Sequence, residues 1–90
     1  MIYITAIHLS GGAKHEHIDS VRWENPSTRK TGESTKQEVV RWLEAHKESE
    51  ARVRNGASYV LVGVVKASPP YIRTYADGVW TDNLLALPRY

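Results

Sequence analysis

The chain has 90 residues, enough for a single domain (residues 1–90) with one modest hydrophobic core. It contains no cysteine, which excludes disulfides and thiolate metal sites, and it has no apolar run long enough to cross a membrane as a helix. The formal net charge is +2, from 12 Lys and Arg against 10 Asp and Glu, so the sequence permits an anionic partner without requiring one.

The chain begins with a predicted β-hairpin. Residues 2–9 are rich in β-branched and aromatic types and predict a strand. They lack the basic start of a signal peptide, so we expect a cytoplasmic protein. After a turn at residues 10–14, residues 16–24 carry many charges, which is typical of an edge strand. A polar loop then covers residues 25–30.

One amphipathic helix is predicted in the stretch from Thr31 to Lys47, and nothing else in the chain has helical periodicity. Its apolar stripe consists of Val39, Val40 and Leu43. Thr35 and Glu38 have the spacing of a capping box, in which each side chain accepts a hydrogen bond from the backbone N–H of the other. One helix must therefore serve the whole core.

The second half of the chain predicts a loop, two longer strands and a tail. Residues 48–56 are polar and contain a short basic cluster, which favours a solvated loop. Residues 58–66 are apolar on both alternating faces, which is typical of a central strand. Residues 71–75 predict another strand. A tight turn follows, after which residues 79–81 can form a short antiparallel segment. The tail at residues 82–90 carries three leucines.

These elements predict an α+β fold in the order β-β-α-β-β. We expect a mostly antiparallel four-stranded sheet with the helix on one face and the C-terminal tail packing back. A helix of about 13 residues is roughly 20 Å long, close to the width of four strands about 4.8 Å apart. The helix can therefore cover one face of the sheet and no more.

Regular alternation divides the strand residues between the two faces of this sheet. The face toward the helix contains Ile2, Ile4, Ile18, Val60, Val62, Val64 and Ile72. The opposite face contains Tyr3, Thr5, Ile7, Val21, Trp23, Tyr59, Leu61, Val65, Tyr71, Arg73 and Tyr75. An apolar, aromatic face of this size is unusual on a soluble monomer, so we expect it to be covered.

Three kinds of cover are open to this second face. The tail can fold back over it, which we favour; a partner protein or a second copy of the chain can bind it; or single-stranded nucleic acid can stack its bases on the aromatic rings. A strong basic surround, which nucleic-acid platforms carry, is absent. The candidate partner-binding residues are Tyr3, Trp23, Tyr71, Arg73 and Tyr75.

Metal and catalytic sites have weaker support. His15, His17 and Asp19 place two imidazoles and a carboxylate within five residues, a pattern that suits a divalent cation but is more often surface polarity at a strand entrance. Glu38 has a structural role in the helix cap, and Glu44 is expected to point outward. No Ser-His-Asp arrangement and no phosphate-binding glycine motif is present. We therefore expect no cofactor and no enzymatic activity.

The stretch from Asp77 to Pro88 is unusual in composition. Asp82 and Asn83 can hydrogen-bond nearby backbone N–H groups, which would shape the tail so that its leucines dock. The alternative is a carboxylate cluster that binds a cation or a basic partner.

Residues 71–74, Asp77 and residues 81–88, with the sequence Thr-Asp-Asn-Leu-Leu-Ala-Leu-Pro, together resemble the C-terminal signature of a small bacterial and phage family, domain of unknown function 3892. The opening Ile-Thr-Ala-Ile strand is similar to the N-terminal part of that family, so the resemblance covers nearly the whole chain. It implies a bacterial or phage origin and no reaction, cofactor or catalytic residue.

These observations favour a small non-enzymatic binding or accessory domain that contacts another protein. For a phage gene, a modulator of a host protein is a natural form of this function. The alternative is a weak nucleic-acid-binding module that uses the aromatic sheet face.

Overall fold

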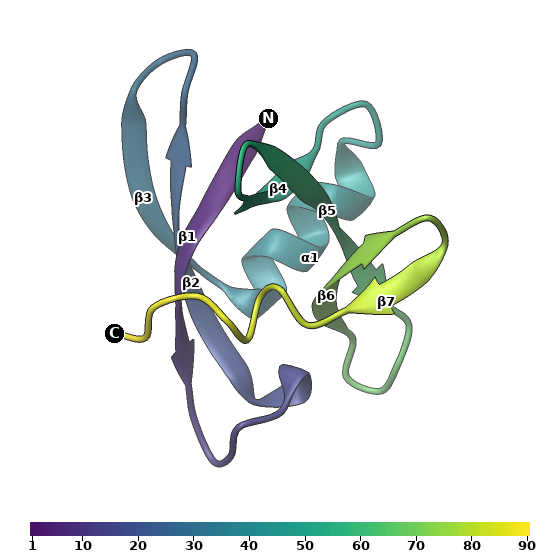
Figure 1. Ribbon diagram of the computed structural model, residues 1–90. Helices are drawn as coiled ribbons and strands as arrows, with labels where there is room; N and C mark the ends of the chain where they lie inside the picture. The colour runs from purple at the N-terminus through teal and green to yellow at the C-terminus, as the bar shows by residue number, and fades with distance from the viewer.

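The computed structural model describes residues 1–90 as one mixed seven-stranded sheet with one α-helix (Figure 1). In chain order the elements are β1 (Ile2–Leu9), the 3-10 helix η1 (His15–His17), β2 (Ile18–Asn25), β3 (Lys30–Thr35), α1 (Lys36–Ala45), β4 (Ala51–Asn55), β5 (Ser58–Val65), β6 (Tyr71–Ala76) and β7 (Val79–Thr81). The order across the sheet is β3-β2-β1-β4-β5-β6-β7. All neighbours are antiparallel except β1 and β4.

The prediction of a four-stranded, mostly antiparallel sheet is therefore wrong. Two of the additional strands, β3 and β4, lie in segments that were expected to be a loop or the start of the helix. β3 is polar along its whole length, so it has no apolar alternation to reveal a strand. β4 lies where a solvated loop was expected, yet Ala51 and Val53 are buried in the centre of the core.

The helix begins as its capping box predicts. The backbone N–H of Glu38 donates to Thr35 Oγ1 at 3.2 Å, and the backbone N–H of Thr35 donates to Glu38 Oε1 at 2.8 Å. α1 is shorter than the predicted stretch because residues up to Thr35 belong to β3. Val39 and Val40 are the buried residues of the helix and contribute to the single hydrophobic core.

Two irregularities in the sheet move residues to the face opposite the one that alternation predicts. The pairing of β1 with β2 shifts register between Ile4 and Ala6, and again between His8 and Leu9. A one-residue shift transfers every later side chain to the other face. Consequently Ile7 and Val21, which alternation assigned to the far face, are both fully buried in the core beside the helix.

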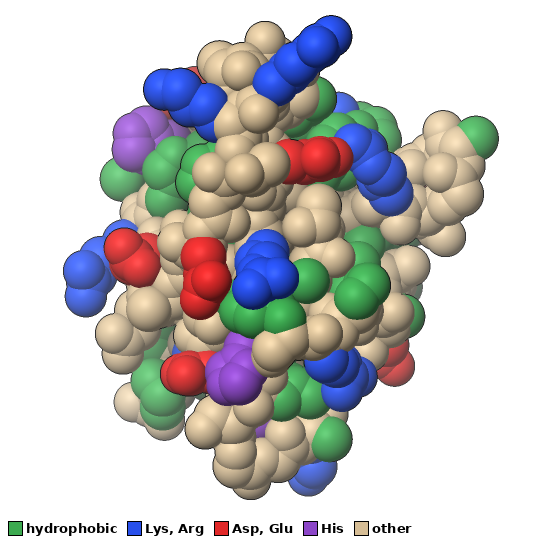
Figure 2. Space-filling model, turned by 90° about the vertical axis from the view of Figure 1, so that its left-hand side faces the viewer, with side chains coloured by type: hydrophobic (Ala, Val, Ile, Leu, Met, Phe, Trp, Pro, Cys, Tyr) green, Lys and Arg blue, Asp and Glu red, His purple; other side chains and the backbone are tan.

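The face of the sheet away from the helix, here called the outer face, is covered in part by the chain's own arginines. The Arg54 guanidinium lies 3.9 Å from the centre of the Tyr3 ring, and Arg52 lies 3.9 Å from the Tyr59 ring. Glu24 pairs with Arg54. Figure 2 accordingly shows basic, acidic and histidine side chains interspersed on the side of the molecule that carries β1–β3. Cation–π contacts and ion pairs thus shield aromatic rings that would otherwise be bare.

The C-terminal tail does fold back, but its buried leucine joins the core on the helix side. Leu84 has no exposed surface. β4 pairs with β1 only at Ile2 and Tyr3, and the tail occupies the same edge of β1 further along. Backbone hydrogen bonds there run from the Ile7 N–H to the Pro88 carbonyl (2.9 Å) and from the Tyr90 N–H to the Ile7 carbonyl (3.1 Å). In Figure 1 the tail, in yellow, crosses from β7 to β1.

Truncation of Leu84 tests this role of the tail. We expect Leu84→Ala to lower the free energy of unfolding by about 2–5 kcal/mol, because it leaves a cavity in a packed core. The matched control is Val79→Ala in β7, a residue that is 64% exposed, and its cost should stay below about 1 kcal/mol. Urea denaturation of both variants measures the difference. Equal losses would contradict a tail that is part of the core.

Candidate functional site

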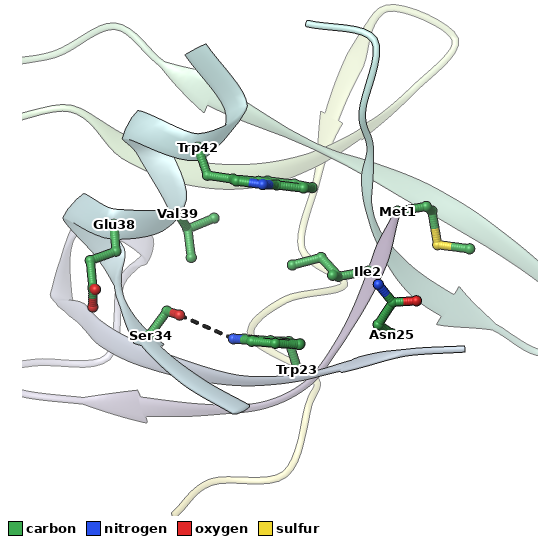
Figure 3. Close-up of a pocket in the computed structure, with 8 residues that line it drawn as sticks. All are labelled: Met1, Ile2, Trp23, Asn25, Ser34, Glu38, Val39 and Trp42. Carbon is green, nitrogen blue, oxygen red and sulfur yellow. Dashed lines mark hydrogen bonds between the residues drawn. The ribbon is translucent and has the colours of Figure 1, made fainter. Parts of the chain in front are cut away.

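A cleft of about 360 Å³ lies between α1 and the strands β1–β3 (Figure 3). Its lining consists of Met1, Ile2, Trp23, Asn25, Ser34, Glu38, Val39 and Trp42. Most of this lining is apolar, and the volume falls in the range of pockets that bind small groups in proteins. We refer to it below as the tryptophan cleft.

Trp23 is held in place by β3. Gly32 lies directly opposite Trp23 in the β2–β3 pair, and a Cβ atom at Gly32 would lie 2.4 Å from Trp23 Cζ2. The indole therefore rests against bare backbone, which only glycine leaves free. In addition, Trp23 Nε1 donates a hydrogen bond to Ser34 Oγ at 3.0 Å. These two contacts fix both the position and the orientation of the ring.

Trp42 forms the opposite wall of the cleft. It lies three residues after Val39 on α1 and therefore shares its helix face. The His46 ring, one turn later, lies 5.9 Å from the Trp42 ring centre to centre. Figure 3 shows the two indoles on opposite sides of the cleft, with the side chains of Ile2 and Val39 lying between their levels. Both tryptophans are only partly buried.

Glu38 supplies the one charged side chain of the lining. Hydrogen bonding to Thr35, first through the Thr35 backbone N–H, holds the pKa of the Glu38 carboxyl below its usual value. The carboxylate is therefore ionised at neutral pH. It lies at the margin of the cleft, where the helix begins.

The structure separates the five residues expected to bind a partner. Trp23 lines the cleft, because the register shifts place it on the helix side of the sheet. Tyr3, Tyr71, Arg73 and Tyr75 lie on the outer face, and Tyr3 is stacked beneath an arginine. Sequence reasoning overlooked Trp42, although its spacing from the buried valines of α1 indicates the same helix face.

A second aromatic group lies on the outer face near β7. The rings of Tyr75 and Trp80 meet edge to face with centres 5.8 Å apart. A Cβ atom at Gly63 would lie 2.9 Å from Tyr75 Cε1, so the tyrosine ring covers a glycine of the neighbouring strand. Trp80 remains 43% exposed. This group packs on itself and leaves a shallow hollow rather than two open ring faces.

The unusual stretch before the tail forms a hydrogen-bond network around Thr74. The Thr81 hydroxyl donates to Thr74 Oγ1 at 2.7 Å, and the Asn83 backbone N–H donates to the same oxygen at 3.1 Å. Arg73 binds Asp82 at 2.8 Å. These contacts fix the start of the tail, as the structural interpretation of this stretch predicts, but the side chains of Asp82 and Asn83 accept from Arg73 and from the Thr81 hydroxyl rather than from backbone N–H groups. Asp82 is paired with a cation of the chain itself, which weakens the alternative of a cation-binding cluster.

The three candidate metal ligands do not converge. The His17 Nδ1 accepts a hydrogen bond from the Lys14 backbone N–H at 3.1 Å, while Asp19 is exposed in the irregular part of β2. His15 is buried, with 7% of its surface exposed. Its Nε2 has no hydrogen-bond partner and lies 3.8 Å from Asp82 Oδ1. No group of three or more His, Asp and Glu side chains gathers anywhere in the structure.

Burial, reinforced by the nearby Arg73, lowers the pKa of the His15 imidazole. Asp82 and Glu16 act in the opposite direction but do not outweigh it. His15 is therefore neutral in the folded protein at neutral pH, and protonation at lower pH works against the fold.

Comparison with known proteins gives one family. The family model described as "Protein of unknown function (DUF3892)" matches residues 3–88. No curated protein and no solved structure matches the chain. None of the helices in the structure combines the length and apolar character that a membrane span requires.

The support of Trp23 by β3 can be tested at Gly32. Gly32→Ala should displace the indole and lower the free energy of unfolding by about 1–3 kcal/mol through overpacking. The Trp23 indole N–H resonance should shift at the same time. Glu33→Ala, the next residue of β3 with its side chain exposed on the outer face, serves as the control and should leave that resonance in place. An unmoved Trp23 signal in Gly32→Ala would show that the ring does not rest on the glycine.

The buried histidine makes stability depend on pH. In the unfolded chain His15 has its ordinary pKa near 6.5, whereas in the folded protein the pKa is lower. The stabilising effect of neutral His15 is complete above pH 6.5 and is lost as pH falls from there toward the folded value, with a slope of up to about 1.4 kcal/mol per pH unit. His15→Gln should remove this slope, whereas replacing the exposed His46 with Gln should retain it. Denaturation curves between pH 5 and 8 provide the measurement, and an unchanged slope in His15→Gln would refute the assignment.

Proposed function

The chain belongs to the DUF3892 family of proteins of unknown function, and we propose that it is a small, non-enzymatic binding domain that acts through protein–protein contact. The observation that carries the proposal is the tryptophan cleft, in which two partly buried indoles face each other across a cleft that Ile2 and Val39 also line. A partner side chain that enters this space would complete the packing.

The energetics of the tryptophan cleft favour such a contact. Apolar surface gains about 25 cal/mol for each Å² that is removed from water, and an indole offers a large area. Trp23 is already held by Gly32 and Ser34, so little conformational entropy is lost when a ligand arrives. Tryptophan is also among the residues most enriched at the centres of protein interfaces.

The proposal of a non-enzymatic role follows from how the reactive groups are used. Glu38 caps the helix, and Glu44 is exposed. Thr74 and Thr81 hydrogen-bond to each other. These roles are structural, and none of these groups forms a nucleophile–base pair.

The partner that we propose is another protein in the cytoplasm, where a chain without cysteine loses nothing in a reducing environment. With the bacterial or phage origin that the family resemblance implies, a host protein modulated by this domain fits the proposal. Binding of a second copy of the chain is the other form of protein contact to be tested.

Nucleic-acid binding by the outer face has less support. The arginines of that face are already used within the chain: Arg73 binds Asp82, Arg52 binds Glu50, and Arg22 lies 3.9 Å from Glu33. Tight phosphate binding needs several free basic groups, because affinity scales with the number of neutralised phosphates. The tyrosine rings of this face are likewise partly covered by guanidinium groups.

A capture experiment with cleft variants tests the proposal. The purified protein, Trp42→Leu and Tyr75→Leu are each used as bait in lysate of the natural host at a salt concentration that screens exposed ion pairs. A partner should be retained by the wild type and by Tyr75→Leu, and lost by Trp42→Leu, because only the last removes a wall of the cleft. Circular dichroism confirms that each bait is folded, and gel filtration shows any self-association. Retention by Trp42→Leu, or recovery of nothing by the wild type, would overturn the proposal.

A further inference from the structure

We infer that the group entering the tryptophan cleft is a cation: the guanidinium of an arginine or the methylated ammonium of a lysine, on a basic segment of the partner. This inference rests on the proposed function and names the chemistry that the same cleft selects. Three observations support it: the orientation of the two indole rings, the charge of the lining, and the arginines that lie over the tyrosine rings elsewhere in this chain.

The first argument is the arrangement of the two indoles. The face of a tryptophan ring carries negative electrostatic potential and attracts a cation more strongly than a tyrosine or phenylalanine ring does. In Figure 3 the faces of Trp23 and Trp42 are directed at the same space from opposite sides. A guanidinium or a methylammonium that enters this space would be attracted by both ring faces.

The second argument is the charge of the lining. Neither lysine nor arginine contributes to it, and its one charged side chain is the carboxylate of Glu38; the α-ammonium group of the chain belongs to Met1, on the side of the cleft opposite Glu38. The cap hydrogen bond from the Thr35 backbone N–H goes to Glu38 Oε1, and the carboxylate lies at the margin of the cleft. Arg41, the cation of the helix whose charge acts on Glu38, is exposed and does not line the cleft. The only charged side chain that a bound cation would meet in the lining is therefore an anion.

The third argument comes from the outer face of the same sheet. There the chain places its own guanidinium groups over tyrosine rings: Arg54 over Tyr3 and Arg52 over Tyr59, each 3.9 Å from the ring centre. Arg22 lies in the same way 4.2 Å from the ring of Tyr90. The two tryptophans of the cleft are the stronger cation acceptors, yet no cation of the chain covers them. A partner's cationic side chain would complete this pattern.

A titration with amino-acid amides identifies the chemistry of the site. The full-length ¹⁵N-labelled protein is titrated at millimolar concentrations with N-acetyl-arginine amide and N-acetyl-trimethyllysine amide, and with their uncharged counterparts N-acetyl-citrulline amide and N-acetyl-norleucine amide. N-acetyl-tryptophan amide represents a neutral aromatic ring. The chain has three tryptophans, so three indole N–H signals report, and Trp80 serves as an internal control outside the cleft.

Both cations should shift the signals of Trp23 and Trp42 and leave Trp80 unmoved. The uncharged counterparts should bind at least about fivefold more weakly, which corresponds to a cation–π contribution of about 1 kcal/mol. Stronger binding of one of the two cations identifies the side chain that the partner presents.

Two variants test the role of each group. Glu38→Gln removes the charge but keeps the helix cap, because glutamine can also accept the hydrogen bond from Thr35; affinity for the cations should fall about two- to fivefold. Glu44→Gln, on the exposed side of the helix, is the matched control and should bind as the wild type does. Trp42→Leu should abolish the shifts of Trp23.

Two results would overturn the inference, and they differ in what they leave standing. If citrulline or tryptophan amide binds the cleft as tightly as the cations do, the site selects a flat group and not a charge, and the proposed function survives. If no amide shifts Trp23 or Trp42, the cleft receives no side chain, and the proposed function falls with the inference.

Discussion

The arrangement of the whole sheet depends on one edge of β1, which pairs partly with β4 and partly with the C-terminal tail. One edge of β1 pairs with β2 along most of its length. The other edge pairs with β4 at Ile2 and Tyr3, and further along it is occupied by the tail through Ile7. Because β4 leaves β1 after two residues, the two halves of the sheet can separate beyond that point. The helix and Leu84 pack into one core with residues from both halves.

This division explains why one helix suffices for a seven-stranded sheet. A flat sheet of that width would expose most of both faces, whereas here the buried residues of nearly all the longer strands meet in one cluster with α1. The outer face is protected by arginine side chains stacked on tyrosines and paired with carboxylates. Long cationic side chains thus cover part of the aromatic sheet face without a second helix.

Sequence reasoning was successful where a single local interaction determines the structure. The capping box of Thr35 and Glu38 marks the start of the helix, and the apolar runs within residues 58–66 and 71–75 correspond to β5 and β6. It failed where pairing across the sheet decides. β3 is a strand because its backbone pairs with β2, and its polar sequence has no alternating pattern that would predict this.

The candidate site was missed for the same reason. Alternation places Trp23 on the outer face, and only the register shifts in the β1–β2 pair return it to the helix side. Such shifts depend on how two distant segments align, which one segment alone does not encode. The helical spacing of Trp42 could have predicted its position on the helix, but its role in a cleft becomes evident only from the position of Trp23 on the other side.

The pairing of Ile7 with residues 88 and 90 also constrains the order in which the chain can fold. Closing a loop of this length directly would cost roughly 4 kcal/mol of chain entropy. The antiparallel strands β4–β7 lie between the helix and the tail in the chain, and their formation shortens the distance that this pairing has to close. With the tail detached, the Ile7 N–H and C=O groups that it satisfies would be unpaired, and that edge of β1 would be open to a strand of a neighbouring chain.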